Sequence, residues 1–88
     1  MAMSFGGKTV TTSATQITSG PALAITIMNN DAAATLYVGT DASVTTTSGF
    51  PIPPQTAFTF DYQTLANATH YFGICSANTI DARWIGRT

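Results

Sequence analysis

Residues 22–28 read Ala-Leu-Ala-Ile-Thr-Ile-Met and are followed at once by residues 29–31, Asn-Asn-Asp. Large aliphatic side chains alternate with other residues here, so that Leu23, Ile25 and Ile27 share one face of an extended chain. A period of two residues is typical of a β-strand with one buried face. Asn and Asp favour the turn geometries that end such a strand. The segment therefore predicts a strand over 22–28 that closes in a turn.

Working outward from this strand, the same preference for extended structure recurs in four further segments. They are 35–39 with Leu36 and Val38 on one face, 57–62 with Phe58, Phe60 and Tyr62 inward, 70–75 with apolar residues on both faces, and 80–87 with Ile80, Ala82 and Trp84 on one face. A weaker, Thr-rich stretch covers 8–17. We expect the strand over 35–39 to pair with the strand over 22–28 across the 29–31 turn. Gly39 is expected to mark a bulge or a close backbone approach.

Residues 49–54, Gly-Phe-Pro-Ile-Pro-Pro, contain three prolines and therefore exclude a central strand. They favour an extended, polyproline-like connection. Because proline lowers the entropy lost on ordering a loop, we expect Phe50 and Ile52 to anchor this crossing to the core or to a neighbouring subunit. Further breaks are expected at 19–21, 63–69 and 76–79.

The fold class predicted from these patterns is all-β, because no segment combines a helical period, helix-forming composition and a helix-like length. Short strands separated by turns favour a small antiparallel β-sandwich or barrel, and the jelly roll is one arrangement that fits. The 88 residues are expected to form a single β domain, 1–88. Within it, residues 1–18 are expected to be either an extended N-terminal arm or an edge strand.

Charge is the most informative feature of the composition. Charged residues make up 8 % of the chain, against about 25 % in an ordinary soluble domain. A formal net charge of −1 gives little repulsion between copies, which suits packing against neighbours. The only Lys and Arg residues are Lys8, Arg83 and Arg87, too few for the basic stripe that nucleic-acid binding needs.

The cellular location is expected to be the cytosol or a particle assembled there. No apolar run approaches the roughly 18 residues of a membrane span, and the N-terminus lacks a signal-peptide pattern. A single cysteine cannot close an intrachain disulfide. We therefore expect neither a membrane partner nor a fold that depends on oxidation.

No pattern in the sequence predicts a catalytic, cofactor or metal site. Lys8 follows two glycines, but the earlier glycine of a phosphate-binding loop is missing. His70 has no nucleophile or carboxylate at a spacing that predicts a triad. Cys75 has no basic neighbour in the sequence, which favours a buried thiol. The four aspartates lack calcium-loop spacing and are better explained as turn residues, so we expect a protein that is not an enzyme.

Six short segments together form a recognisable series. They are residues 29–31 (Asn-Asn-Asp), 36–39 (Leu-Tyr-Val-Gly), 48–54 (Ser-Gly-Phe-Pro-Ile-Pro-Pro), 58–60 (Phe-Thr-Phe), 71–75 (Tyr-Phe-Gly-Ile-Cys) and 80–84 (Ile-Asp-Ala-Arg-Trp). With them the chain resembles a group of small bacteriophage virion proteins over roughly its last two thirds. The resemblance implies a capsid decoration, head-fibre or tail-associated domain without catalytic residues. Gln55 departs from the group, which carries glycine at that point of the turn.

Together these features predict a non-enzymatic structural component of a bacteriophage virion, most simply a capsid decoration or cement protein that binds and stabilises the shell. Its expected partners are the major capsid protein or another virion protein, and further copies of itself, a trimer being one option. The alternative is a tail- or fibre-associated domain that recognises a cell-surface glycan. It would reside in the virion, assembled in the host cytoplasm. The candidate interface residues are Phe50, Ile52, Arg83, Ile85 and Arg87.

Overall fold

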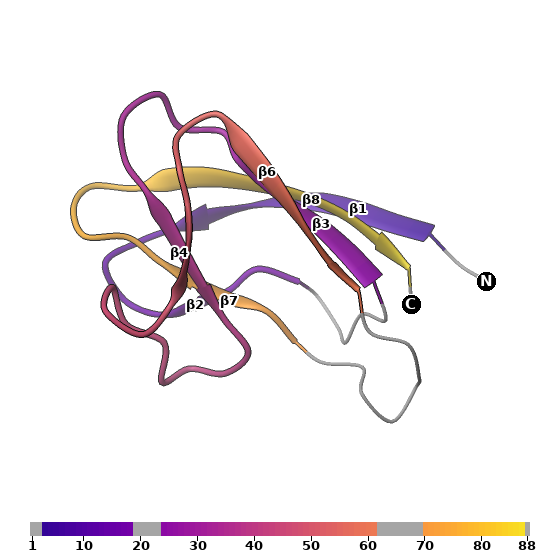
Figure 1. Ribbon diagram of the computed structural model, residues 1–88, viewed down its shortest axis with the longest axis horizontal. Helices are drawn as coiled ribbons and strands as arrows, with labels where there is room; N and C mark the ends of the chain where they lie inside the picture. Colours follow the sequence, from indigo (N-terminus) through magenta and orange to yellow (C-terminus); the bar gives the residue numbers. More distant parts are fainter. Residues whose placement is uncertain (1–2, 19–23, 62–69, 88) are drawn as a thin grey trace.

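The computed structural model describes residues 3–18, 24–61 and 70–87, and this part of the chain consists of strands and connections without a helix. The strands are β1 (Met3–Val10), β2 (Thr15–Gln16), β3 (Ala24–Asn29), β4 (Leu36–Gly39), β5 (Phe50–Ile52), β6 (Thr56–Asp61), β7 (Phe72–Ile74) and β8 (Ile80–Arg87). They form two four-stranded antiparallel sheets in two layers (Figure 1). The prediction of an all-β fold is confirmed, and of the two architectures expected the structure is the sandwich.

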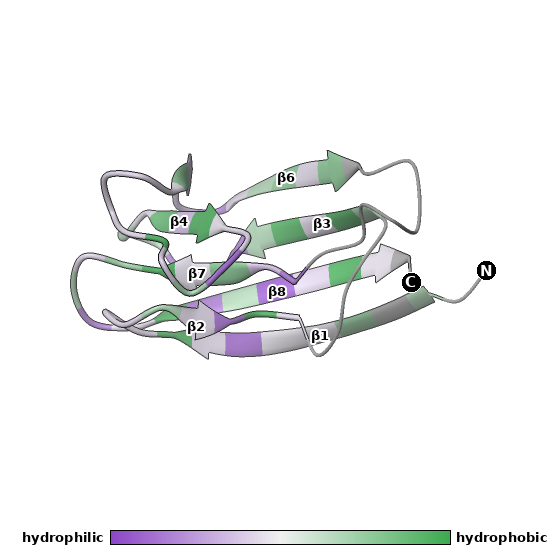
Figure 2. Ribbon diagram, turned by 90° about the horizontal axis from the view of Figure 1, so that it is seen from below, coloured by the Kyte–Doolittle hydropathy of each residue, from purple (hydrophilic) through white to green (hydrophobic). Residues whose placement is uncertain are grey.

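The strand order follows a nested pattern. Sheet A has the order β1-β8-β3-β6 and sheet B the order β2-β7-β4-β5. The first strand pairs with the last, the second with the seventh, the third with the sixth and the fourth with the fifth. The chain is therefore one long hairpin rolled up on itself, which is the jelly-roll arrangement of eight strands. Figure 2 shows β6, β3, β8 and β1 side by side, behind the shorter strands of sheet B.

The hairpin predicted between the strands over 22–28 and 35–39 is wrong. β3 lies between β8 and β6 in sheet A, whereas β4 lies between β7 and β5 in sheet B. The 29–31 segment is a corner that carries the chain from one layer to the other. Ile25 and Leu36 are both buried, so the apolar faces of β3 and β4 both line the core between the sheets.

The core fills the space between the two sheets. Its buried members are Val10, Ile17, Ile25, Ile27, Leu36, Val38, Ile52, Tyr71, Cys75, Ile80 and Ala82. The alternation predicted for β3, β4 and β8 is confirmed, because the residues expected to face inward are buried, apart from Trp84, which is partly exposed. Each fully buried aliphatic side chain contributes about 1.5–3 kcal/mol to stability.

The connection after β4 also meets its prediction. A Cβ atom built on Gly39 would lie 2.7 Å from the Cβ of Val44, so the glycine permits a close approach. The Asp41 carboxylate accepts hydrogen bonds from the backbone N–H and the hydroxyl of Ser43, which makes a local turn. These bonds lower the pKa of Asp41, with the hydroxyl of Ser43 as the larger cause.

The N-terminal prediction needs a correction. The Thr-rich stretch over 8–17 is not one element: β1 begins at Met3 and ends at Val10, and β2 covers only two residues. Between them Ser13 donates its N–H to the hydroxyl oxygen of Thr11, which closes a turn. The predictions for Leu23, Tyr62 and the breaks at 19–21 and 63–69 fall outside the described residues.

Candidate interaction surfaces

The corner after β3 depends on the buried amide of Asn29. Its Nδ2 donates to the carbonyl oxygens of Ala34, at 2.8 Å, and of Ile52, at 3.0 Å. Its Oδ1 accepts the backbone N–H of Asp31 at 3.0 Å. One side chain thus joins the end of β3, the approach to β4 and the end of β5. Because its bonding capacity is used within the fold, Asn29 is a structural residue and offers nothing to a ligand.

Asp31 completes the same corner. Its carboxylate accepts the backbone N–H groups of Ala34, at 2.7 Å, and Ala33, at 2.9 Å. The bonds from Ala34 and then Ala33 lower the pKa of Asp31. Its backbone carbonyl oxygen accepts the N–H of Gln55, which ties the corner to the turn after β5. Residues 29–31 therefore form the hydrogen-bonded corner that connects the two sheets.

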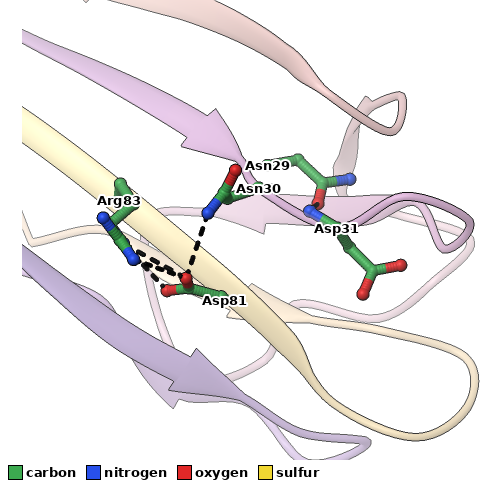
Figure 3. A network of polar contacts seen from close by, with 5 residues as sticks. All are labelled: Asn29, Asn30, Asp31, Asp81 and Arg83. Atoms are coloured by element: carbon green, nitrogen blue, oxygen red, sulfur yellow. Dashed lines mark hydrogen bonds and ion pairs between the residues drawn. The ribbon is translucent and has the colours of Figure 1, made fainter.

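A polar group continues from this corner onto the outer face of sheet A (Figure 3). Arg83 forms an ion pair with Asp81 at 2.9 Å, and Asn30 donates its Nδ2 to the same carboxylate at 3.2 Å. The Arg83 guanidinium and then the Asn30 amide lower the pKa of Asp81, while the Asp81 carboxylate raises the pKa of Arg83. Arg83 was expected to pair with a neighbouring molecule. Within one chain it is already paired with its own strand.

Apolar side chains gather beside this ion pair. Phe5 of β1 lies directly opposite Ile85 of β8, and Met3 lies opposite Arg87. The exposed fractions are 82 % for Phe5, 63 % for Met3 and 50 % for Ile85. We call Met3, Phe5 and Ile85 the outer patch. Sequence reasoning found Ile85 and missed the other two, because it began the first strand at Lys8 and so did not see the alternation of residues 3, 5, 7 and 9.

Phe50 and Ile52 differ in burial in the structure. Ile52 is buried in the core, whereas Phe50 is 44 % exposed. The Phe50 ring packs against Phe58, at 4.6 Å between centroids, and Phe60, at 5.8 Å. Phe58 is 43 % exposed, although it was expected inward. It does lie on the inner face of sheet A, opposite Ile27, but at the edge strand, where Phe50 covers only part of the ring.

The prediction for the Arg87 side chain falls outside the described residues. What can be placed is its backbone, which sits opposite Met3 of β1 and Ala24 of β3 at the end of sheet A.

A cleft of about 470 Å³ opens between β1 and the segment of β2. Its lining residues are Phe5, Gly6, Gly7, Lys8, Gln16, Ile17, Thr18 and Trp84. A Cβ on Gly6 would lie 3.2 Å from Nε1 of Trp84, so the indole lies against the glycine backbone at this cleft. Gln16 donates its Nε2 to the carbonyl oxygen of Thr18 at 2.7 Å. No local sequence pattern predicts this cleft, since it depends on the β1–β8 pairing.

Cys75, the candidate nucleophile, and His70, the candidate base, lie at opposite ends of β7. Cys75 is buried, and its Sγ lies 3.5 Å from the carbonyl oxygen of Asn78. Burial raises the pKa of the Cys75 thiol, which keeps it protonated and weakly reactive. His70 is exposed, at the other end of β7. Within the described residues these groups do not form a nucleophile with an adjacent base.

Among the residues that the structure describes, His, Cys and Asp side chains do not gather into a group that could hold a metal ion. The same part of the chain contains no helix long and apolar enough to cross a bilayer. Comparison with protein-family models, with curated proteins and with solved structures finds no match to this chain.

Proposed function

We propose that this protein is a non-enzymatic structural component of a bacteriophage virion, a capsid decoration or cement protein that attaches through the outer face of sheet A. The observation that carries the proposal is the outer patch. Large apolar side chains that are half or more exposed lie next to the Asp81–Arg83 pair, on the outer face of sheet A. Exposed apolar groups bordered by polar ones mark protein contact sites.

Three further features support this role. The chain carries few charges, so copies packed densely on a shell repel one another little. The jelly-roll order is shared with many viral capsid domains, which is an analogy of fold and no more. The resemblance to small virion proteins rests on the corner, turn and strand segments described above. The proposed partner is the major capsid protein or another repeated virion protein.

The proposed mechanism is adhesion. Each copy makes a small contact through its outer patch, and the symmetry of the shell repeats that contact many times. A weak contact that is repeated holds neighbouring shell subunits together without any chemical step.

Co-sedimentation with particles that lack the protein tests this proposal. Ile85→Lys should abolish attachment, because it places an unpaired cation in the apolar contact. Arg83→Glu combined with Arg87→Glu should weaken it, because both positions lie on the same face. The matched control is Ala77→Lys, which adds the same charge in the exposed turn before β8. Attachment of Ile85→Lys at the level of the control would rule out this face.

A second candidate function, a tail- or fibre-associated glycan-binding domain, is favoured by one observation. The cleft beside β1 combines an indole ring with a side-chain amide and a single cation, from Trp84, Gln16 and Lys8. Aromatic rings pack against the apolar faces of sugars, and such polar groups fix their hydroxyls.

The chain contains a single tryptophan, so its fluorescence reports directly on this cleft. A glycan found on an array should shift the Trp84 emission, and Gln16→Ala should weaken that binding. A particle count separates the two functions: shell-like copy number supports decoration, and tail-like copy number supports glycan recognition.

A further inference from the structure

We infer that two copies of this chain pair along the free edge of β1, so that their A sheets join into one continuous sheet. The inference concerns the isolated protein and goes beyond attachment to a shell. It begins from the edges of the two sheets, since each edge strand presents unpaired backbone N–H and C=O groups that can pair with another chain.

Two of the four edges in the described part of the chain are protected. β2 is only two residues long. β5 has three residues, and the middle one is Pro51, which has no N–H to donate. Short length and proline are ordinary devices that stop strand addition. β6 has six residues and an exposed edge, so it is the shorter of the two open edges of sheet A.

β1 has none of these devices. It is eight residues long, and its register with β8 runs without interruption from Met3 to Val10, so no bulge bends it away. It contains no proline and only one charged residue, Lys8. Its outermost large side chain, Phe5, is 82 % exposed. A strand of this kind is a template for pairing.

The side chains of β1 indicate that the partner is a second copy. On the outer face the order along the strand is large, large, small and small: Met3, Phe5, Gly7 and Thr9. Antiparallel pairing about a two-fold axis at Gly6 places Phe5 over Gly7 of the second copy and Met3 beside Thr9 of the second copy. Large residues then meet small ones in both directions, which is the self-complementarity that a two-fold contact requires. A phenylalanine over a cross-strand glycine is a recurring stabilising pair in sheets.

Charge permits the same arrangement. In this register the two Lys8 side chains are not opposite one another, so like charges do not meet across the pair. The net charge of −1 on each copy opposes the approach very little.

Sedimentation velocity over a range of concentrations tests the inference on the isolated protein. The wild-type chain should form dimers. Phe5→Lys removes the large residue and Gly7→Val fills the space that receives it, and each should weaken dimerisation by about tenfold or more. The monomer should tolerate both, because Phe5 is exposed and the nearest atom to a Cβ on Gly7 is in the flexible Arg83 side chain, at 3.3 Å, with the Ala82 carbonyl oxygen at an ordinary 3.6 Å.

Ile85 lies opposite Phe5 on the same face of sheet A, but on β8, which is not an edge strand. Ile85→Lys is therefore the matched control. It should leave the dimer intact while it abolishes shell attachment, so failure of this inference and failure of the proposed function are distinguishable. A wild-type chain that stays monomeric, or that forms a trimer, would overturn the inference. A dimer that is disrupted by Ile85→Lys but not by Phe5→Lys would also overturn it, because that result indicates two copies stacked face to face rather than joined at their edges.

A distance measurement checks the register. Spin labels on Thr9→Cys should lie about 20 Å apart in the dimer, the length of strand from Thr9 to Met3. The native Cys75 is buried and stays unlabelled. A single short distance under about 10 Å would place Thr9 on the two-fold axis and contradict the pairing about Gly6.

Discussion

Asn29 is the residue on which the corner between the two sheets depends most. Its amide bonds to backbone groups of Asp31, Ala34 and the distant Ile52, and it is completely buried. A buried group that loses its partner costs far more than an exposed one, because water cannot replace the bond. The joint between the two sheets therefore depends on this one side chain.

Asn29→Ala is expected to destabilise the protein by about 3 kcal/mol, since it leaves two carbonyl oxygens and one N–H without partners. Chemical denaturation measures the loss. Asn30→Ala is the matched control: it removes one bond to a half-exposed carboxylate and should cost less than about 1 kcal/mol. Equal losses at the two positions would contradict this account of the corner.

Gln55 lies in the left-handed region, with φ of 56°, in the turn between β5 and β6. Glycine adopts this conformation without steric cost, whereas a residue with a side chain does not. Gln55→Gly should therefore stabilise the protein by about 0.5–1 kcal/mol, as measured by thermal melting. Asn78→Gly, at φ of 61°, should gain less because asparagine tolerates this region. A larger gain at Asn78 would oppose the explanation.

Acid is expected to weaken the fold through its aspartates. Backbone N–H groups lower the pKa of Asp31 in the folded state below its ordinary value of 3.8. The stabilisation is therefore complete above pH 3.8 and is lost as the pH falls through the lower folded-state pKa. Melting temperatures recorded from pH 7 downward should drop in that window. Asp31→Asn should show a shallower drop, and an unchanged slope would assign the effect to Asp41 and Asp81 instead.

Among the elements, strands were predicted well from the sequence where one face of the strand is buried, and poorly where both faces are largely exposed. β3, β4 and β8 were found because the core imposes a period of two on their side chains. β1 was started too late, since an edge strand with exposed Met3 and Phe5 and two glycines has little such period. The pairing of β3 with β8 and β6 could not be read from any local pattern, because it joins residues far apart in the chain.

The segment of β5 gives a test of burial within one element. Ile52→Ala should cost about 3 kcal/mol, because it leaves a cavity in the core. Phe50→Ala should cost only about 1 kcal/mol, since nearly half of that side chain is already in water and it loses mainly its contacts with Phe58 and Phe60. Denaturant unfolding of both variants decides. A larger loss for Phe50→Ala would mean that the aromatic cluster, and not the core, holds β5.

For the molecule as a whole, the candidate surface was only partly predictable. Alternation along β8 placed Arg83 and Ile85 outward, and the shortage of charge indicated a contact surface. The outer patch also needs Met3 and Phe5, and the cleft needs Trp84 of β8 to lie against Gly6 of β1. Both arise from pairing between the two ends of the chain, which the sequence does not display.

Cys75 reports on the opening of the whole sandwich. It lies between the sheets with the thiol protonated, so a thiol reagent should reach it only when the fold opens. Labelling of the native protein is expected to be slower than labelling in denaturant by about a hundredfold or more. Asn29→Ala should accelerate it by about tenfold for each 1.4 kcal/mol of lost stability. Labelling of the native wild-type chain as fast as the unfolded chain would show that Cys75 is accessible.

The strand order of sheet A also governs how the chain must fold. β8 comes last of the eight strands, yet it lies in the middle of sheet A and is the only strand that joins β1 to β3. A nascent chain that has emerged as far as Thr79 can pair β3 with β6, but β1 has no partner strand in sheet A. Sheet A is complete only once β8 pairs with both β1 and β3, and such distant pairing is slow. Until then both edges of β1 are open to association with other chains.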